Sequence, residues 1–570
     1  MRRSGGVIVR LLIALIVVGA AFGPAPPPVT AGGSDLLPDL RMDPLDQFRT
    51  EVSGGQRRLR FRTVMTNKGS GPLEVHGKRD NLSQPHLTTR QRIFDPAGGS
   101  RYVNSRALME YARDGHDHWH IQGVMLYQLW SASGATRRGT KVGFCFLDSV
   151  RRGAPSTASR AYNMSICGDQ GDLTNKMGLS VGWGDDYPAD FAYQWIDIST
   201  LVPGDYTVQA KADEQNWYIE SNESNNCAWA RVRITSTNGP LTVVASGQGA
   251  CQAPPASTAK VERQYGDDRF QTAAAVSEDA FAPGVPVAYV ATGEKFPDAL
   301  VAGAAAGFRG GPVILVKQNY LPALAIAELE RLNPGRIVVV GGPQAVSDYV
   351  FGLVNKYQTG GGTTRVFGGD RYGTAAAISR NTFPTPGVGV PAVYVASGEN
   401  WPDALAAVPY AARAGGPVLL VLKDSIPNSI KAELDRLNPG RIIIAGGPSA
   451  VSNAVATQLD AYDTGPGVQR VSGFDRYGTA AALSKHHYPV PPARQVAYVA
   501  TGSNFPDAIG AGPAAARRNA PIILVQATAI PSVSATELNR LNLRRILLLG
   551  GTRAITMTIH TRLEQYADGG

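Results

Sequence analysis

The second half of the chain repeats itself three times, and this repeat constrains the fold more than any other feature of the sequence. Each copy carries Asp-Arg-aromatic, then aromatic-Pro-Asp-Ala, then an apolar run that ends in Gly-Gly. The Pro-Asp-Ala landmarks begin at Phe296, Trp401 and Phe505, which are 105 and 104 residues apart. Such a unit is longer than the repeats of solenoid proteins. The sequence therefore predicts three small tandem domains.

Within each copy, apolar strands alternate with helices. In the first copy, the expected strands are 287–291, 312–316 and 336–340, which are apolar throughout except for Arg336, and 298–308 and 321–332 have helical patterns between them. Strands that are apolar on both faces are typical of parallel sheets covered by helices on both sides. Each unit is therefore predicted to be an α/β domain with a parallel sheet.

The first half of the chain has a different pattern, in which apolar and polar residues alternate over short segments. Examples are 58–65, 123–130, 194–198 and 206–212. This period is typical of half-buried antiparallel strands, so we expect an all-β, sandwich-like N-terminal domain. A Ser/Gly/Pro/Thr-rich linker over 246–258 follows it.

The N-terminus has the features of an export signal. Arg2, Arg3 and Arg10 precede or flank an apolar run from Leu11 to Phe22, which is shorter than the ~20 residues of a membrane-spanning helix. We expect a signal peptide over residues 1–31, with an uncleaved N-terminal anchor as the alternative. The net charge of +9 becomes +6 when these arginines are removed. A basic exported chain favours anionic surroundings such as wall polymers, and export argues against nucleic acid.

Four cysteines all lie in the first half of the chain, at Cys145, Cys167, Cys227 and Cys251. An even number of cysteines in an oxidising compartment predicts two disulfides. Three pairings are open on this reasoning.

Three histidines at alternate positions form the strongest candidate site. His116, His118 and His120 would share one face of a strand, with Asp117 and Trp119 on the other. Three imidazoles on one face suit a divalent ion, and both zinc and Cu(II) accept such ligands. A zinc hydrolase would also need a carboxylate base at the open site, and Asp117 points away on this geometry.

The segments that follow the histidines resemble the lysyl oxidase family over about residues 36–251. They are Lys141-Val-Gly-Phe-Cys, Asp185-Asp-Tyr-Pro, Gln194-Trp-Ile-Asp and Glu220-Ser-Asn-Glu-Ser-Asn-Asn. The resemblance implies that His116, His118 and His120 hold Cu(II), and that Lys141 and Tyr187 together form the organic cofactor lysine tyrosylquinone. Asp185, two residues before Tyr187, is the candidate proton acceptor.

The family pattern and short loop lengths also favour pairing Cys145 with Cys167 and Cys227 with Cys251. The sequence departs from the animal pattern at Gly115, where the animal proteins have a cysteine before the first histidine.

The repeat landmarks resemble the cell wall binding repeat 2 modules of Gram-positive surface proteins, over about residues 262–570. This resemblance implies noncovalent attachment to anionic wall polysaccharide by a group of three modules. Arg269, Arg371 and Arg476 of the Asp-Arg pairs are candidates for touching polymer, and structural ion pairs are the alternative. The Gly-Gly strand ends lack G-x-G-x-x-G and a Walker lysine, which argues against nucleotide binding.

The sequence thus predicts a multidomain chain: signal peptide 1–31, lysyl oxidase-like copper domain 36–251, linker 252–261, and wall-binding repeats 262–360, 361–465 and 466–570. The function expected is a copper- and quinone-dependent amine oxidase, secreted and held at a Gram-positive-type cell wall, with no transmembrane span after signal cleavage. Its substrate would be a primary amine, possibly peptidyl lysine, whose identity the sequence leaves open. The alternative is a metal-binding surface adhesin without redox chemistry. A wall-modifying enzyme in the second half is disfavoured, because no nucleophile, histidine or carboxylate pair recurs there.

Overall fold

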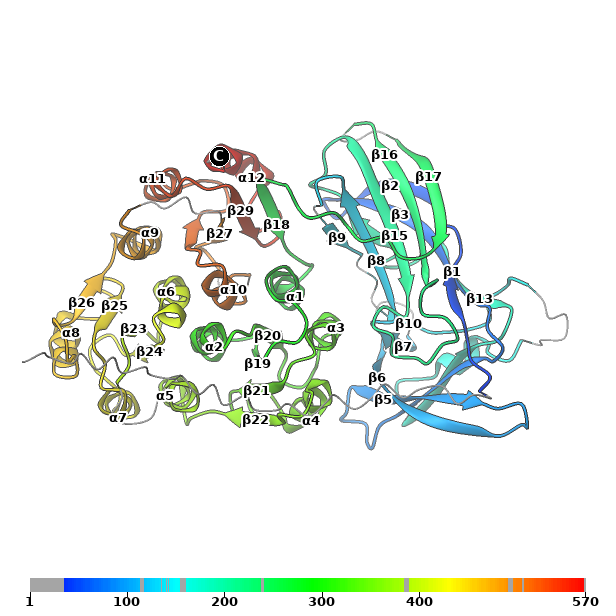
Figure 1. Ribbon diagram of the computed structural model, residues 1–570, viewed down its shortest axis with the longest axis horizontal. Helices are drawn as coiled ribbons and strands as arrows, with labels where there is room; N and C mark the ends of the chain where they lie inside the picture. The colour runs from blue at the N-terminus through cyan, green and yellow to red at the C-terminus, as the bar shows by residue number, and fades with distance from the viewer. Residues whose placement is uncertain are drawn as a thin grey trace, which may run out of the picture.

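The computed structural model describes residues 35–112, 117–134, 136–139, 141, 143–153, 160–236, 240–383, 389–490, 496–504 and 507–567. Figure 1 shows a β domain beside a ring of three α/β units. The expected signal peptide and His116 lie outside the described residues. Among the described residues, no helix combines the length and the apolar composition that crossing a membrane requires.

The N-terminal domain consists of three antiparallel sheets, as predicted. The first contains β1 (Leu40–Met42), β2 (Asp46–Ser53), β3 (Gln56–Asn67), β11 (Val150–Arg151), β13 (Trp183–Tyr187) and β14 (Trp195–Asp197). The second contains β4 (Leu73–Lys78), β5 (His86–Phe94), β6 (Ser100–Tyr111), β7 (Trp119–Gln122), β10 (Gly143–Phe144) and β12 (Thr174–Leu179). The third contains β8 (Met125–Ser131), β9 (Thr136–Arg138), β15 (Gly204–Ala212), β16 (Cys227–Ile234) and β17 (Leu241–Gly249).

Two segments of this domain differ from the predicted succession of strands followed by a linker. A short 3-10 helix, η1, covers Met164–Cys167. The Ser/Gly/Pro/Thr-rich stretch 246–258 is not a linker at its start, because Ser246 to Gly249 belong to β17 and pair with β16; the predicted linker 252–261 begins after this strand. The small and polar side chains of Ser246 to Gly249 weaken the alternating signal by which strands are recognised.

Each α/β unit has a parallel four-stranded sheet, and one of its edge strands comes from the next unit around the ring. The first sheet is ordered β20 (Val313–Val316), β19 (Val287–Thr292), β21 (Arg336–Val340), β22 (Thr363–Val366). The second is β24 (Val418–Val421), β23 (Val393–Ser397), β25 (Ile442–Ala445), β26 (Gln469–Val471). The third is β28 (Ile522–Val525), β27 (Val496–Thr501), β29 (Arg545–Leu549), β18 (Val261–Gln264). Since β18 begins the first repeat and pairs with β29 of the third, strand exchange closes the three units into a ring.

The helices cover these sheets, and one helix of each unit faces the centre of the ring. The repeats contribute α1 (Arg269–Ala280), α2 (Phe296–Arg309), α3 (Ala323–Leu332), α4 (Asp348–Val354) with η2 (Asn355–Tyr357); α5 (Arg371–Thr382), α6 (Pro402–Arg413), α7 (Asn428–Leu437), α8 (Asn453–Asp460); and α9 (Arg476–His487), α10 (Ala511–Arg517), α11 (Ser532–Leu541), α12 (Met557–Leu563) with η3 (Glu564–Tyr566). Helices α2, α6 and α10 meet in the middle of the ring (Figure 1). Small residues permit this approach: a Cβ atom on Gly307 would lie 2.9 Å from that of Ala412 and 3.0 Å from that of Ala516.

Replacing Gly307 with alanine should therefore destabilise the ring by about 1–3 kcal/mol, because the added methyl overpacks the central contact. Gly352 provides the matched control: it is exposed in α4 and an added Cβ meets nothing within 4 Å. Gly352→Ala should stabilise by about 0.5–1 kcal/mol, as expected for glycine in a helix. Thermal unfolding of both variants checks the prediction, and an equal response to the two substitutions would contradict it.

Candidate active site

Two of the three predicted metal ligands are described, and their rings converge. The Nε2 atoms of His118 and His120 are 3.0 Å apart, and the ring centroids are 4.7 Å apart. The continuous strand expected through the three histidines is not present, because β7 begins at Trp119 and Asp117 has a φ of 46°. A left-handed residue interrupts the strand, so a turn rather than simple alternation brings His118 next to His120. His116 lies outside the described residues.

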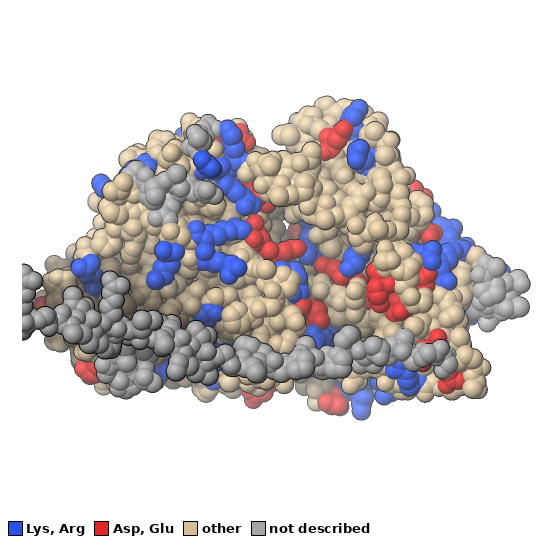
Figure 2. Space-filling view, in the orientation of Figure 1, with Lys and Arg blue, Asp and Glu red and all other residues tan. Residues whose placement is uncertain are grey.

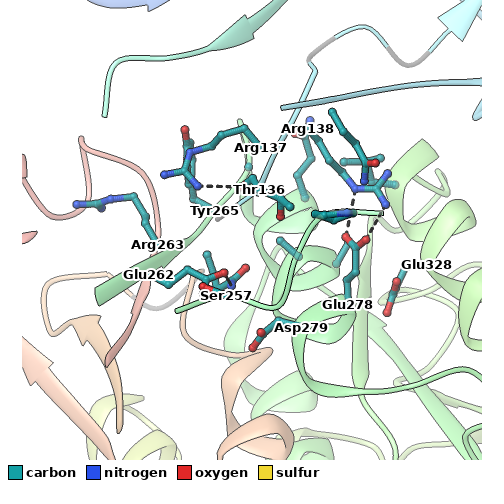
Figure 3. Close-up of a pocket in the computed structure, with 18 of the residues that line it drawn as sticks. Thr136, Arg137, Arg138, Ser257, Glu262, Arg263, Tyr265, Glu278, Asp279 and Glu328 are labelled. Atoms are coloured by element: carbon teal, nitrogen blue, oxygen red, sulfur yellow. Dashed lines mark hydrogen bonds and ion pairs between the residues drawn. The ribbon is translucent and has the colours of Figure 1, made fainter. Parts of the chain in front are cut away.

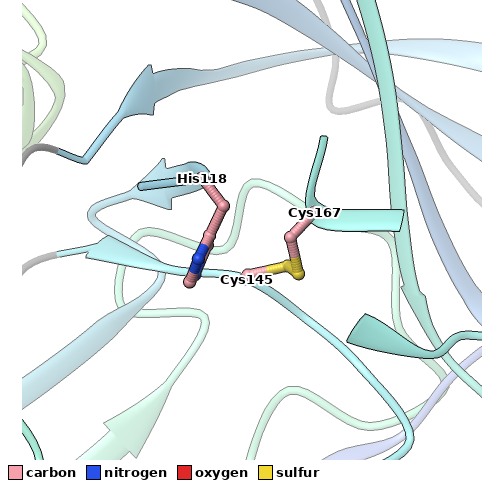
Figure 4. Close-up of side chains that lie close together, drawn as sticks. All are labelled: His118, Cys145 and Cys167. Carbon is pink, nitrogen blue, oxygen red and sulfur yellow. A yellow bond between two sulfur atoms is a disulfide. The ribbon is translucent and has the colours of Figure 1, made fainter. Parts of the chain in front are cut away.

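A disulfide lies directly beside His118. Cys145 is bonded to Cys167 (Figure 4), and Cys227 is bonded to Cys251, which confirms the predicted pairing. A ring nitrogen of His118 and the sulfur atoms of Cys145 and Cys167 all lie within 4.8 Å of one another. Because a bonded sulfur is no longer a thiolate, this disulfide is not a metal-ligand pair; it ties the segment after Lys141 to η1 beneath the histidines.

Lys141 and Tyr187 are brought together across 46 residues of sequence. The Lys141 Nζ atom lies 5.0 Å from the centroid of the Tyr187 ring and 5.2 Å from that of Phe144. Strand β13 fixes the tyrosine through its antiparallel pairing with β3, in which Tyr187 is opposite Thr63. Both side chains are buried, with 4% of Lys141 and 6% of Tyr187 exposed. The amine and the ring therefore face each other in a site largely closed to water.

Asp185 lies at the same site and is also buried, with 2% exposed. Burial raises the pKa of Asp185 well above its ordinary value, and its hydrogen bond with Tyr187 and the charge of Lys141 oppose that rise. Burial and the neighbouring Asp185 raise the pKa of Tyr187 well above its usual range. The Tyr187 hydroxyl donates to the carbonyl oxygen of Cys145 at 3.2 Å. Among the described residues, Asp185 Oδ2 has no hydrogen-bond partner.

The β domain also contains a cluster of three carboxylates that the sequence analysis did not predict. Carboxylate oxygens of Asp213, Glu220 and Glu223 lie within 4.8 Å of one another and could hold a cation. Burial raises the pKa of Asp213 to about 7. The signal in the sequence is the repeated Glu-Ser-Asn pattern around Glu220, whose oxygen-rich composition suits hard cations.

The three repeat arginines occupy equivalent positions at the starts of α1, α5 and α9. Arg269, Arg371 and Arg476 donate to the carbonyl oxygens of Gly293, Gly398 and Gly502 at 2.8, 2.6 and 2.5 Å. The preceding aspartates cap these helices through their side chains. Each arginine also attracts the Pro-Asp-Ala aspartate of the preceding unit around the ring: Asp507, Asp298 and Asp403 respectively. The two landmarks of the repeat therefore meet at the junctions between units, a relation that sequence order alone does not show.

Together these features define a class of protein in which a β domain with a buried lysine, tyrosine and histidine group precedes a closed ring of three α/β units. The chain carries a lysyl oxidase domain, matched over residues 99–244. Three repeats of cell wall binding domain 2 (CWB2) follow it, matched over residues 263–351, 365–456 and 470–560.

Curated relatives each match part of the chain. N-acetylmuramoyl-L-alanine amidase LytC of Bacillus subtilis (strain 168) is 25% identical over 304 residues, which cover 53% of this chain and 58% of that protein. The amidase enhancer of the same organism is 27% identical over 317 residues, covering 55% of this chain and 42% of that protein. Lysyl oxidase homolog 4 of Mus musculus is 33% identical over 120 residues, covering 21% and 14%. The chain thus spans about half the length of the first two relatives.

Two solved structures share the fold. Cwp8 from Clostridium difficile has a TM-score of 0.51 and 17% identity, with 90% of this chain and 88% of that chain covered. Cwp6 from the same organism has a TM-score of 0.50 and 17% identity, with 89% and 66% covered.

Proposed function

We propose that the protein is a secreted, cell-wall-associated amine oxidase of the lysyl oxidase type, dependent on copper and a quinone made from its own side chains. The observation that carries the proposal is the pairing of Lys141 with Tyr187: a buried amine lies 5.0 Å from the centre of a buried phenol ring. A buried lysine is costly unless its surroundings compensate or use it, and this pair is the one that the family resemblance predicts.

The residues present fit the implied metal and cofactor. Two imidazole nitrogens 3.0 Å apart are directed to one place, as ligands of a single ion are, and His118, His120 and His116 would hold Cu(II). Lys141 and Tyr187 would provide the quinone. When bound, copper and quinone supply the two-electron oxidation of a primary amine: amine, O₂ and water give aldehyde, ammonia and hydrogen peroxide.

The chain's own groups have separate roles in this reaction. Burial of Lys141 and Tyr187 excludes water from the reacting end of the pocket. Asp185 accepts the proton from the carbon next to the substrate nitrogen, a role that a carboxyl with a raised pKa suits at neutral pH. The CWB2 repeats hold the oxidase at anionic wall polysaccharide, with Arg269, Arg371 and Arg476 as candidate polymer contacts.

Mass spectrometry of protein loaded with copper in air tests the proposal. We expect a crosslinked peptide pair joining Lys141 to Tyr187, with a gain of one oxygen atom and a loss of four hydrogen atoms, because two O₂ molecules are consumed and water and hydrogen peroxide are released. The Lys141→Arg variant, loaded in parallel, should give no crosslink. Unmodified Lys141 and Tyr187 after loading would reject the oxidase and leave a metal-binding adhesin.

A further inference from the structure

A pocket lies between the β domain and the ring, where the first CWB2 repeat packs against the β domain. His86 of β5 stacks on Tyr320 of this repeat, with ring centroids 4.8 Å apart. Arg138 of β9 donates to Glu278 of α1 at 2.9 Å (Figure 3). Figure 2 shows charged side chains of both signs gathered along this boundary. The pocket has a volume of about 490 Å³, and its walls come from the β domain, the linker and the first and third repeats.

The carboxylates that line this pocket have partners within the chain or are solvated. Four of them pair with arginines: Glu262 with Arg545, Asp279 with Arg518, Glu278 with Arg138, and Glu328 with Arg331. Asp197 accepts from the backbone amide and the hydroxyl of Ser199 at 2.9 and 2.5 Å. Asp267 is exposed. The acidic groups of the pocket are therefore compensated without a ligand.

Arg263 of β18 lines the same pocket and is buried with part of its hydrogen-bonding capacity unused. Only 2% of it is exposed, and its Nη1 atom donates to the carbonyl oxygen of Gly550 at 2.7 Å. Among the residues that the structure describes, its Nε and Nη2 atoms have no hydrogen-bond partner. These two atoms form the edge of a guanidinium that presents two parallel donors to one anion. Arg62 shows this use, because its Nε and Nη2 atoms each donate to an oxygen of Asp186 at 2.7 Å.

The equivalent arginines of the other two repeats have a side-chain acceptor that Arg263 lacks. Their Nη2 atoms contact the first residue of a helix: Arg365 with Asp348 of α4 at 3.0 Å, and Arg470 with Asn453 of α8 at 3.5 Å. The first residue of the equivalent helix α12 is Met557, whose thioether is only a weak acceptor. Arg263 has therefore kept its place in the repeat and lost the acceptor on its neighbour.

Arg137 of β9 brings a second positive charge to this pocket from the β domain. Two of its nitrogen atoms donate to Thr136 and Thr200, and its Nε atom has no partner within the described part of the chain. Its guanidinium carbon lies 5.3 Å from the centroid of the Tyr265 ring. The buried Tyr265 hydroxyl also has no hydrogen-bond partner among the described residues. Figure 3 shows Arg137, Tyr265 and Arg263 together on one side of the pocket.

The two guanidinium groups act on each other and on a neighbouring histidine. Burial, and after it the charge of Arg137, lower the pKa of Arg263 to about 10. Burial and the charges of both arginines lower the pKa of His560 to about 4. A buried positive charge is costly unless an opposite charge accompanies it. An anion bound beside both arginines would offset their repulsion and accept from donors that the chain leaves without partners.

We propose that this pocket binds an oxyanion group, as in phosphate or a small carboxylate, with two of its oxygens on the Nε and Nη2 atoms of Arg263. Arg137 and Tyr265 are its further donors. Because Arg137 belongs to the β domain and the other two residues belong to the ring, the bound anion stabilises the contact between them. None of these residues takes part in the proposed amine oxidation, so the site is tested independently of it.

The test is calorimetric titration of inorganic phosphate, and separately of acetate, into the full chain in a chloride medium of constant ionic strength. We expect one saturable site per chain, and the anion that binds more tightly identifies the group preferred. Arg263→Lys keeps the positive charge but loses the two-donor edge, so it should weaken binding roughly tenfold or more. Tyr265→Phe should weaken it roughly threefold to tenfold, and the fold accommodates this change because Phe367 stands at the equivalent position of the next repeat.

The matched control is Arg365→Lys, which makes the same substitution at an equivalent arginine that already has an acceptor; it should leave anion binding unchanged. Thermal unfolding gives a second measurement, since a ligand of the folded state raises the unfolding midpoint. Excess phosphate should raise the midpoint of the unsubstituted chain and of the control more than that of Arg263→Lys. The absence of saturable binding of both anions would overturn the inference. So would binding that neither Arg263→Lys nor Tyr265→Phe weakens, because the anion would then occupy another site.

Discussion

Tyr187→Phe should reduce peroxide release from primary amines to the level of a buffer blank. Phenylalanine fills the same buried space, but without the phenol oxygen its ring cannot be oxidised to a quinone or joined to Lys141. Enzymes supply roughly 10⁶-fold or more over the uncatalysed reaction, and loss of the cofactor should remove nearly all of that. Coupled peroxidase detection with copper-loaded protein measures the effect, and hydrazine-type carbonyl reagents should block the unsubstituted protein in the same assay.

Tyr127→Phe is the matched control, since Tyr127 and Tyr187 are both buried and both pack edge-to-face on Phe144. The Tyr127 hydroxyl lies 2.7 Å from that of Thr63, so its loss should cost about 0.5–1.5 kcal/mol of stability per hydrogen bond and leave turnover largely intact. Peroxide release by Tyr187→Phe at more than a few per cent of the unsubstituted rate would refute the quinone role.

In the three α/β units, the sequence predicted the order of strands and helices along the chain, but it did not predict which strands pair with each other. The strands and helices expected over 287–340 are present as β19, α2, β20, α3 and β21. The exchange of β22, β26 and β18 between units was not predicted, because an apolar strand pattern shows burial but not which sheet receives the strand.

The family resemblance and the residue pattern predicted different parts of the candidate site. The pairing of Lys141 with Tyr187 could be anticipated only from the resemblance, since neither residue stands out by itself. The position of His118 depends on the left-handed backbone at Asp117, which period-two reasoning does not anticipate. The contact of the first repeat with the β domain could be predicted in part, because Tyr320 and Glu278 differ from the equivalent residues of the other two repeats. Their partners His86 and Arg138 belong to another domain and could not be inferred from the repeat.

Asp185→Asn should lower kcat for amines by about 10²–10⁴-fold, the contribution of a positioned general base. Asparagine has nearly the same shape but cannot accept the proton from the carbon next to the substrate nitrogen. Crosslinking of Lys141 to Tyr187 should still be detectable by mass spectrometry, which separates loss of the base from loss of the cofactor. Asp190→Asn, at an exposed position of the same segment, should retain full activity.

The pH dependence of amine oxidation is a second test of the role of Asp185 as the base. Asp185 must be ionised to act as a base, and burial raises its pKa well above the ordinary value. Activity should therefore be low in acid and rise with pH through that raised pKa, rather than near pH 4 where an exposed aspartate ionises. In Asp185→Asn this rise of activity with pH, the acidic limb of the profile, should disappear. The residual rate should then be independent of pH across the same interval. If the variant instead kept the limb at its original pH, the proton would be accepted by another group, and Asp185 would serve only to position Tyr187 through their hydrogen bond.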